Sequence, residues 1–185
     1  MIIWSSRFNT YLLLSLLGVL LAGCRSAESK RANQLATFRV HAEVRGQSDT
    51  SKLISVFRSS PIVLYVEKEP FLTEGMVKEA KVIDLPGGAF SLQVQLTKHA
   101  TLLLEQYSAR SLSKHIAIFA EFGPQEKRKI FAEARWLAAP VIDKRIANGM
   151  LVFTPDADHK EAEEIALGLN SVARKRKAVS YIDEE

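Results

Sequence analysis

Cysteine is almost absent from this chain of 185 residues, because Cys24 is the only one. A single thiol cannot form a disulfide within the chain, so the class of disulfide-stapled secreted domains is excluded. The hydrophobic content of 47% and the charged content of 25% are those of an ordinary globular protein. The length suits one domain with an appendage and is sufficient to bury a core.

A concentrated charge of one sign is also lacking. The formal net charge is +4, and Arg7 is the only charged residue among the first 23, so the chain from Cys24 onward carries 24 − 21 = +3. Nucleic-acid-binding proteins usually present a basic face, and here the signs are interleaved, so no nucleic acid is expected as a partner. A block of four basic residues, 174–177, ends a predicted helix. A solvated helix end is favoured there over a contact with lipid headgroups or nucleic acid.

Groups of catalytic or metal-binding residues are missing as well. The four histidines have no i,i+4 pairing and no cysteine partner, and these are His41, His99, His115 and His159. A zinc site needs three or four ligands at defined spacing. The serines before His115 lack the Gly-x-Ser-x-Gly elbow of a hydrolase. We therefore expect no enzyme, no cofactor, no metal and no small-molecule substrate.

The N-terminus reads as a targeting segment. Arg7 gives a short positive region, and residues 11–21 are apolar but too few to span a bilayer comfortably. They end in Leu21-Ala22-Gly23-Cys24, which resembles the lipobox of bacterial lipoproteins. The resemblance implies cleavage between Gly23 and Cys24 and acylation of Cys24, whereas an uncleaved signal anchor is the alternative. Several acyl chains hold a protein on a membrane firmly.

The same resemblance implies a location. In lipoproteins of bacteria with two membranes, an aspartate after the lipidated cysteine favours retention in the inner membrane, and here Arg25 follows Cys24. We therefore expect a lipid-anchored protein of the cell envelope, in the outer membrane and facing the periplasm if the host has two membranes. Residues 24–37 are small, polar and charged, which suits a tether, although they also include good helix formers.

Period-two hydrophobicity predicts several strands. Residues 38–44 alternate, with His41 on the exposed face, and residues 53–57 are a second short strand, so residues 38–60 form an N-terminal extension. Residues 62–66 are almost uniformly apolar, as in a central strand covered on both faces. Residues 78–84 and 90–96 flank Pro86-Gly87-Gly88, which signals a hairpin.

The second half of the chain alternates helices and strands. Thr97 is the predicted N-cap of a helix over residues 98–110. Strands are expected over 115–122 and 130–137, joined by a charged hairpin tip, and over 150–153 after an Asn148-Gly149 turn. Asp158 and Glu161 have capping-box spacing for a helix that ends near residue 175, before a loose tail at 178–185. We expect an α+β fold, a largely antiparallel or mixed sheet with two amphipathic helices on one face.

These stretches together resemble the head subdomain of the first periplasmic region of SecD, a membrane subunit that assists bacterial protein export. Four pieces carry the resemblance: residues 66–73 with 77–82, Val94-Gln95-Leu96 with the helix that follows, Ile116-Ala117-Ile118, and residues 137–169, which include Ala139-Pro140-Val141-Ile142 and Phe153-Thr154. The resemblance implies that residues 61–177 form a SecD-head-like domain. We expect no counterpart of the transmembrane half of SecD, and residues 121–135 are longer than the tight hairpin of SecD.

The resemblance implies a binding role. We expect a lipid-anchored, non-catalytic envelope protein whose domain binds a polypeptide or protein partner, with a possible link to export. A structural lipoprotein that packs in a larger assembly without a client is the alternative. The candidate contact residues are Trp136, Phe122, Lys127 and Arg128, at or beside the insertion. Aromatic side chains at an open hairpin edge suit partner contacts, although core packing is the more common role of a tryptophan there.

Overall fold

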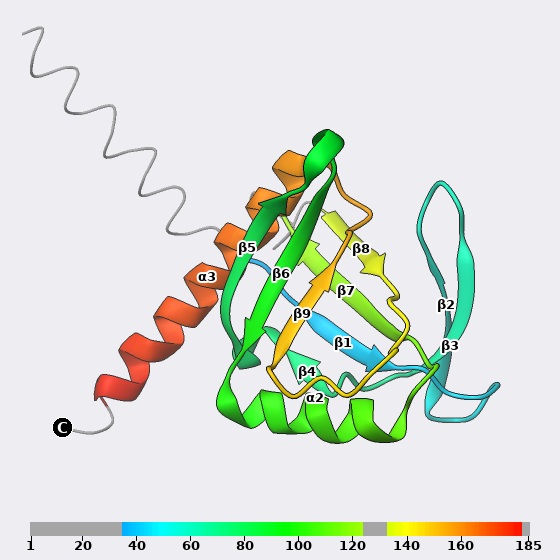
Figure 1. Cartoon of the computed structure of the whole chain (residues 1–185). Helices are drawn as coiled ribbons and strands as arrows, with labels where there is room; N and C mark the ends of the chain where they lie inside the picture. The colour runs from blue at the N-terminus through cyan, green and yellow to red at the C-terminus, as the bar shows by residue number, and fades with distance from the viewer. Residues whose placement is uncertain (1–34, 124–132, 183–185) are drawn as a thin grey trace, which may run out of the picture. The chain divides into compact units, whose positions relative to one another are not determined.

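Each pairing between neighbouring described strands is antiparallel (Figure 1). The computed structural model describes residues 35–123 and 133–182. Its strands are β1 (Arg39–Ala42), β2 (Ser51–Val56), β3 (Ile62–Glu67), β4 (Leu72–Thr73), β5 (Val77–Asp84), β6 (Phe90–Leu96), β7 (Ile116–Phe122), β8 (Glu133–Ala138) and β9 (Met150–Phe153). The helices are α2 (Lys98–Arg110) and α3 (His159–Ile182), with single 3-10 turns η1 (Glu74–Met76) and η2 (Pro86–Gly88).

The described strands form three sheets. The first has the order β4-β1-β7-β8, the second is the hairpin β2-β3, and the third has the order β5-β6-β9. In Figure 1, α2 crosses one end of the two larger sheets and α3 runs along β5. The predicted α+β class with antiparallel sheets and two helices is confirmed, although the strands divide into three sheets.

The β5–β6 hairpin forms where Pro86-Gly87-Gly88 predicts it. Gly87 and Gly88 have φ angles of 81° and 80°, a region that L side chains rarely adopt. The Leu85 N–H donates to the Ala89 carbonyl at 2.8 Å and closes the turn. The two strands then pair from Asp84 opposite Phe90 to Val77 opposite Leu96.

Both helices begin at the predicted caps. The Thr97 hydroxyl accepts a hydrogen bond from the Ala100 N–H, and Ala100, Leu104 and Tyr107 form the buried stripe of α2. At α3, the Glu161 N–H donates to the Asp158 carboxylate at 2.7 Å and the Asp158 N–H donates to the Glu161 carboxylate at 2.9 Å, which is a complete capping box.

The helix α3 is longer than the sequence predicts. It continues to Ile182, past the expected end near residue 175 and into the expected loose tail. The segment after residue 173 is rich in arginine and lysine and contains no glycine or proline, so nothing in it stops helix propagation. Arg135 of β8 holds the first turn of α3 through a two-pronged ion pair with Glu161, at 2.9 and 3.0 Å.

The main core lies between the two larger sheets and both helices. Its largest fully buried side chains include Phe38, Phe122, Leu92, Leu104 and Leu169. Alternate residues of β7 serve two different cores, because Ile116, Ile118, Ala120 and Phe122 face this one while Ala117 faces the other way.

The second core is a thin layer between β7, β8 and the β2–β3 hairpin, which we call the hairpin seam. It consists of Ile54, Val56, Val66, Ala117 and Ala139, with Trp136, Phe57, Ile62 and Leu64 packed at its margin. A two-stranded hairpin is at best marginally stable by itself. The seam therefore holds the hairpin on the domain.

The prediction of a central strand at residues 62–66 is wrong. One edge of β3 pairs with β2 along its length. Within the described part of the chain, the other edge of β3 forms a single β-bridge, between Val66 and Glu43. Val63 is 61% exposed. A short run of β-branched residues fits a pleated surface of any kind, and its apolar character alone does not say how many faces are covered.

Two further expectations about the N-terminal part need correction. His41 is 2% exposed, not on a wet face, because the hairpin covers that side of β1. The predicted tether ends too late, since Ala36 and Thr37 are buried in the domain. A Cβ added at Gly168 of α3 would lie 2.7 Å from the Ala36 backbone nitrogen, so the N-terminal segment crosses α3 at the one residue without a side chain.

Among the described helices, none has the length and apolar character that crossing a membrane requires.

Candidate functional site

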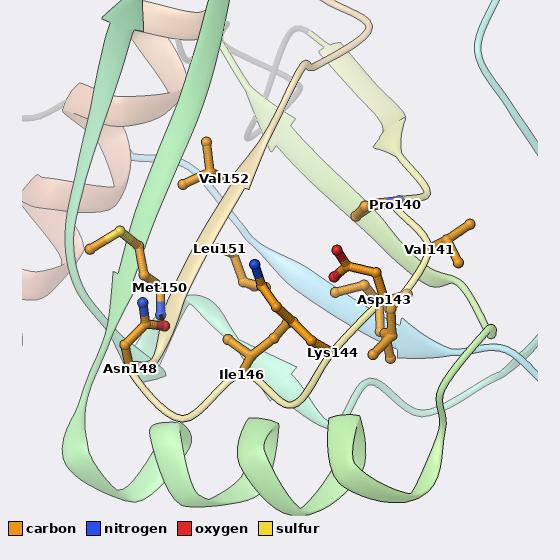
Figure 2. A pocket seen from close by; sticks show the side chains of 11 residues that line it. Pro140, Val141, Asp143, Lys144, Ile146, Asn148, Met150, Leu151 and Val152 are labelled. Atoms are coloured by element: carbon orange, nitrogen blue, oxygen red, sulfur yellow. Dashed lines mark hydrogen bonds between the residues drawn. The ribbon is translucent and has the colours of Figure 1, made fainter.

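A groove of about 310 Å³ lies between β9 and the segment that follows β8 (Figure 2). Met150, Leu151 and Val152 of β9 form one wall, and Pro140 and Val141 lie across from them. The floor is apolar, because Ile116, Ile142 and Leu151 are almost fully buried. The rim carries one charge of each sign, since Asp143 and Lys144 are both exposed.

The wall of Pro140 and Val141 continues the edge of the first sheet. The Ile116 N–H donates to the Pro140 carbonyl at 3.1 Å, and the Ile142 N–H donates to the Lys114 carbonyl at 2.8 Å. Val141 lies between these two bonds, opposite His115. In an antiparallel pair this alternation turns the Val141 N–H and carbonyl away from β7.

The opposite wall, β9, is the edge of the third sheet. The Leu96 N–H donates to the Gly149 carbonyl at 2.9 Å, and the register then pairs Val94 with Leu151. By alternation the backbone of Val152 points away from β6. No described residue hydrogen bonds to the Val152 N–H or carbonyl on that side.

The two walls therefore share one property. At Val141 and at Val152, each presents a backbone that no described residue pairs with on its outer side, and each of these valines is 52% exposed. An unpaired strand edge is a template for another extended chain. The groove combines two such edges with an apolar floor.

The turn before β9 requires a glycine. Gly149 has a φ of 64°, and an added Cβ would lie 2.0 Å from the Thr101 hydroxyl oxygen of α2. The Gln95 side-chain amide donates to the Asn148 carbonyl at 3.1 Å, and the Asn148 side chain accepts from the Met150 N–H at 3.1 Å. The turn thus sets both the start of β9 and its register with β6.

The loop between the walls is fastened to α2. The Ile146 N–H donates to the hydroxyl of Ser108, a fully buried residue, at 2.9 Å. Arg145 forms an ion pair with Glu105. These contacts hold residues 143–148 against the helix, so the groove has a preformed end.

A second cavity, of about 470 Å³, lies between the end of β1 and the C-terminal half of α2. Glu43, Phe71, Tyr107, Arg110 and Lys114 are among its lining residues. Burial raises the pKa of the Tyr107 phenol, and a hydrogen-bonding influence of Ser111 opposes that rise. The Tyr107 hydroxyl has no hydrogen bond of good geometry within the described structure. Acids and bases are mixed around this cavity without a catalytic arrangement.

The histidines are separated in space as well as in sequence. His41 is buried, His99 is exposed on α2, and the His115 ring lies 2.8 Å from Glu43. His159 lies 2.8 Å from Asp84. No group of three or more histidine, cysteine, aspartate or glutamate side chains fit for a metal occurs in residues 35–123 and 133–182.

The structure separates the contact residues predicted from the sequence. Phe122 is 1% exposed and belongs to the core, which is inconsistent with a surface contact. Trp136 is partly buried at the hairpin seam, with its ring 5.1 Å from that of His41 and 5.2 Å from that of Phe119. Lys127 and Arg128 lie outside the described residues, as do Gly23, Cys24 and Arg25.

Sequence reasoning assigned the groove residues to architecture. The Ala139-Pro140-Val141-Ile142 run and the Asn148-Gly149 turn were interpreted as elements of the fold, without a role in a site. The available signal was the four-residue length of the strand after Asn148-Gly149, because very short strands are common at sheet edges. Which second edge lies opposite it depends on tertiary structure.

Comparison with known proteins finds solved structures with a similar fold. No protein with a curated description matches the sequence significantly. A solved structure described as "Structure and function of a membrane component SecDF that enhances protein export" is similar over 80% of this chain and 67% of its own, with 18% identity and a TM-score of 0.50. A second, "Crystal structure of SecDF in Super-membrane-facing form", is similar over 78% of this chain, with 18% identity and a TM-score of 0.51.

The structural matches cover different shares of the two solved structures. This chain spans only 20% of the second structure, so the likeness concerns one part of a larger protein. At this identity the two structures speak for the fold alone. A sequence model of the family "SecDF, P1 head subdomain" matches residues 51–173, which is more than half of the chain. The chain therefore belongs to the SecDF P1 head subdomain family.

Proposed function

We propose that this protein is a lipid-anchored, non-catalytic component of the cell envelope that binds an extended polypeptide in the groove beside β9. The observation that carries the proposal is the pair of unpaired strand edges, at Val141 and Val152, on either side of an apolar floor. A polypeptide that enters the groove can add as a strand to either edge. Its backbone then supplies affinity and its apolar side chains fill the floor.

The family supports a link with protein export. The first similar structure is described as that of a membrane component that enhances protein export. An exported chain is unfolded while it crosses a membrane, so its backbone groups and apolar side chains are available. Strand addition suits such a client because it depends chiefly on backbone groups and little on sequence.

The proposed anchor rests on the sequence. The Leu21-Ala22-Gly23-Cys24 lipobox supports cleavage before Cys24 and acylation of its thiol, and Arg25 supports an outer-membrane location in a host with two membranes. A tether at the N-terminus would keep the domain attached to the membrane. Among the described residues no metal-binding cluster exists, and the groove holds no catalytic arrangement of side chains.

Blocking the β9 edge tests the proposal. Val152→Pro removes the outward N–H and places a proline ring on the edge, whereas Val152→Thr keeps the branched shape and the N–H. We expect the wild type and Val152→Thr to bind reduced, carboxymethylated α-lactalbumin, a permanently unfolded polypeptide, and Val152→Pro to bind at least about ten-fold more weakly. Fluorescence anisotropy of the labelled polypeptide measures this.

Thermal unfolding of the three proteins controls for folding, because the outward N–H of Val152 makes no ladder bond that proline would remove. Equal affinity of the wild type and Val152→Pro would remove β9 from the proposal. No binding by any of the three, with a stoichiometric envelope complex recovered from native membranes, would favour a structural lipoprotein without a client.

A further inference from the structure

The last turns of α3 extend beyond the family domain. The family match ends at residue 173, and α3 continues to Ile182. Figure 1 shows this end of the helix running past the sheets and away from them. The first four residues after the family match are Arg174, Lys175, Arg176 and Lys177, the longest unbroken run of basic residues in the chain. In this segment residues 174, 175 and 177–179 are exposed, and Arg176 is half-buried.

The exposure of this segment suits an interface with lipid. Arg174, Lys175 and Lys177 are exposed, while Arg176 donates to the Gly75 carbonyl and so fastens the helix to η1. Val179, one turn further, is 57% exposed. The sequence from 178 to 182 reads Ala-Val-Ser-Tyr-Ile, so apolar residues and a tyrosine directly follow the basic run. This order is typical of helices that lie at a membrane surface.

The chain between the proposed lipid anchor and the domain is short enough to keep this segment within reach of the membrane. The N-terminal chain enters the domain at Leu35 and Ala36, against Gly168 of α3. The 11 steps from residue 24 to residue 35 span at most about 40 Å. Along the helix, residues 174–182 lie only about 9–21 Å from Gly168. The segment is thus within reach of the bilayer that would hold Cys24.

The charges near the anchor have the sign that an anionic surface attracts. Residues 25–34 contain Arg25, Lys30 and Arg31 against Glu28, a net charge of 3 − 1 = +2. Residues 174–185 carry four basic residues against the acidic residues 183–185, a net charge of 4 − 3 = +1. The acidic residues 183–185 weaken the attraction of this segment to an anionic membrane. Removing basic residues should therefore weaken membrane binding, and removing acidic residues should strengthen it.

We propose that residues 174–182 of α3 are a second membrane contact, which lies on the anionic phospholipid surface of the bilayer that holds the lipidated N-terminus. The proposal rests on the lipid anchor proposed above. A single attachment leaves a domain free to turn on its tether, whereas two contacts fix which side faces the lipid. The exposed basic residues of this segment contact the headgroups, and Val179 lies at the boundary of the acyl chains.

An environment-sensitive probe at residue 179 tests the contact. The full chain carrying Val179→Cys, purified after its processing in cells, is labelled with nitrobenzoxadiazole and reconstituted into phosphatidylcholine vesicles with or without phosphatidylglycerol. We expect blue-shifted emission only with phosphatidylglycerol, reversed by high salt. Lys175→Gln with Lys177→Gln should lower the ratio of bound to free helix ends about five-fold for each charge removed. Lys98→Gln with Lys160→Gln, which removes the same charge elsewhere, should not.

Glu184→Gln with Glu185→Gln should raise the ratio of bound to free helix ends. Flotation of the same vesicles separates the two proposals, because a processed chain floats with either lipid through its acyl chains. Flotation without any emission shift, or a shift that ignores lipid charge and salt, would overturn the second contact alone. A chain that floats with neither lipid would overturn the anchor.

Discussion

At His41, burial opposes the charged form of the side chain. It is 2% exposed, and its ring Nδ1–H donates to the Glu67 carbonyl at 2.8 Å, which joins β1 to the end of β3. Burial lowers the pKa of His41, the bond to Glu67 opposes that change, and the charges of Lys52 and Arg39 lower it further. The neutral ring packs beside the hairpin seam against Trp136, and Lys52 lies 5.1 Å above the ring of that tryptophan.

The lowered pKa of His41 makes the stability of the domain depend on pH. Because the folded pKa of His41 is below its unfolded value of about 6.5, the unfolded state binds the proton more tightly. The contribution of the neutral His41 ring to the free energy of unfolding is complete above pH 6.5. It is lost as the pH falls through the folded pKa, and the free energy of unfolding then changes by at most about 1.4 kcal/mol per pH unit. Urea unfolding at pH 7.5 and pH 5.5 measures the loss.

His41→Gln keeps a donor for the Glu67 carbonyl and removes the titration, so its stability should change less between the two pH values. His99→Gln, on the exposed surface of α2, should behave like the wild type. Equal pH slopes for the wild type and His41→Gln would show that His41 does not couple the seam to protons.

At the scale of elements, the β2–β3 hairpin depends on its contacts more than on its own ladder. Its outer face carries Leu53 and Val63, both more than half exposed, while its inner face packs in the seam. At its tip, the Arg58 N–H donates to the Asp156 carboxylate at 2.9 Å, and the Arg58 side chain pairs with the same group. The ion pair is exposed and contributes little by itself.

Truncation within the seam should therefore loosen this element. Val56→Ala removes buried methyl groups from a residue that is 0% exposed and should cost roughly 2 kcal/mol. Hydrogen exchange should accelerate in β2 and β3 and stay unchanged in β5 and β6. Ser55→Ala, on the exposed face of the same strand, is the matched control and should have no effect. Uniform acceleration across all the strands would instead mean that the hairpin unfolds only with the whole domain.

Local chemistry explains which elements the sequence could predict. Thr97, the Asp158–Glu161 box and Pro86-Gly87-Gly88 act within a few residues, and all three occur as predicted. The division into three sheets and the burial of His41 depend on which strands meet, a property of long-range contacts. The groove was missed for the same reason, since Val141 and Val152 become opposite walls only after two separate sheets have formed.

At the scale of the whole molecule, two buried layers hold the three described sheets together. The main core joins the larger sheets and both helices, and the hairpin seam joins the hairpin to the opposite side of β7. The N-terminal segment is part of this assembly, because Ala36 lies against Gly168 of α3 and the Thr37 N–H donates to the Glu121 carbonyl at 2.9 Å.

A side chain at Gly168 should disrupt that junction. Gly168→Leu gains about 1 kcal/mol in helix propensity, but it pushes the Ala36 backbone away, at a cost of about 1–3 kcal/mol or more because the contact is with main-chain atoms. We expect a net loss of stability in chemical unfolding and faster proteolysis near residue 35. Gly75→Leu, where an added Cβ meets only the Thr73 hydroxyl at 3.8 Å, should be tolerated. Equal losses in the two variants would contradict a specific junction.

The position of β1 inside its sheet determines how the domain bears mechanical load. The N-terminal segment leads directly into β1, which lies between β4 and β7 and pairs with them over two and four residue pairs. Tension on that segment acts along the strand, so the ladders on both sides are sheared together and do not unzip one pair at a time. The domain is thus joined to the segment that precedes it at a point that resists pulling.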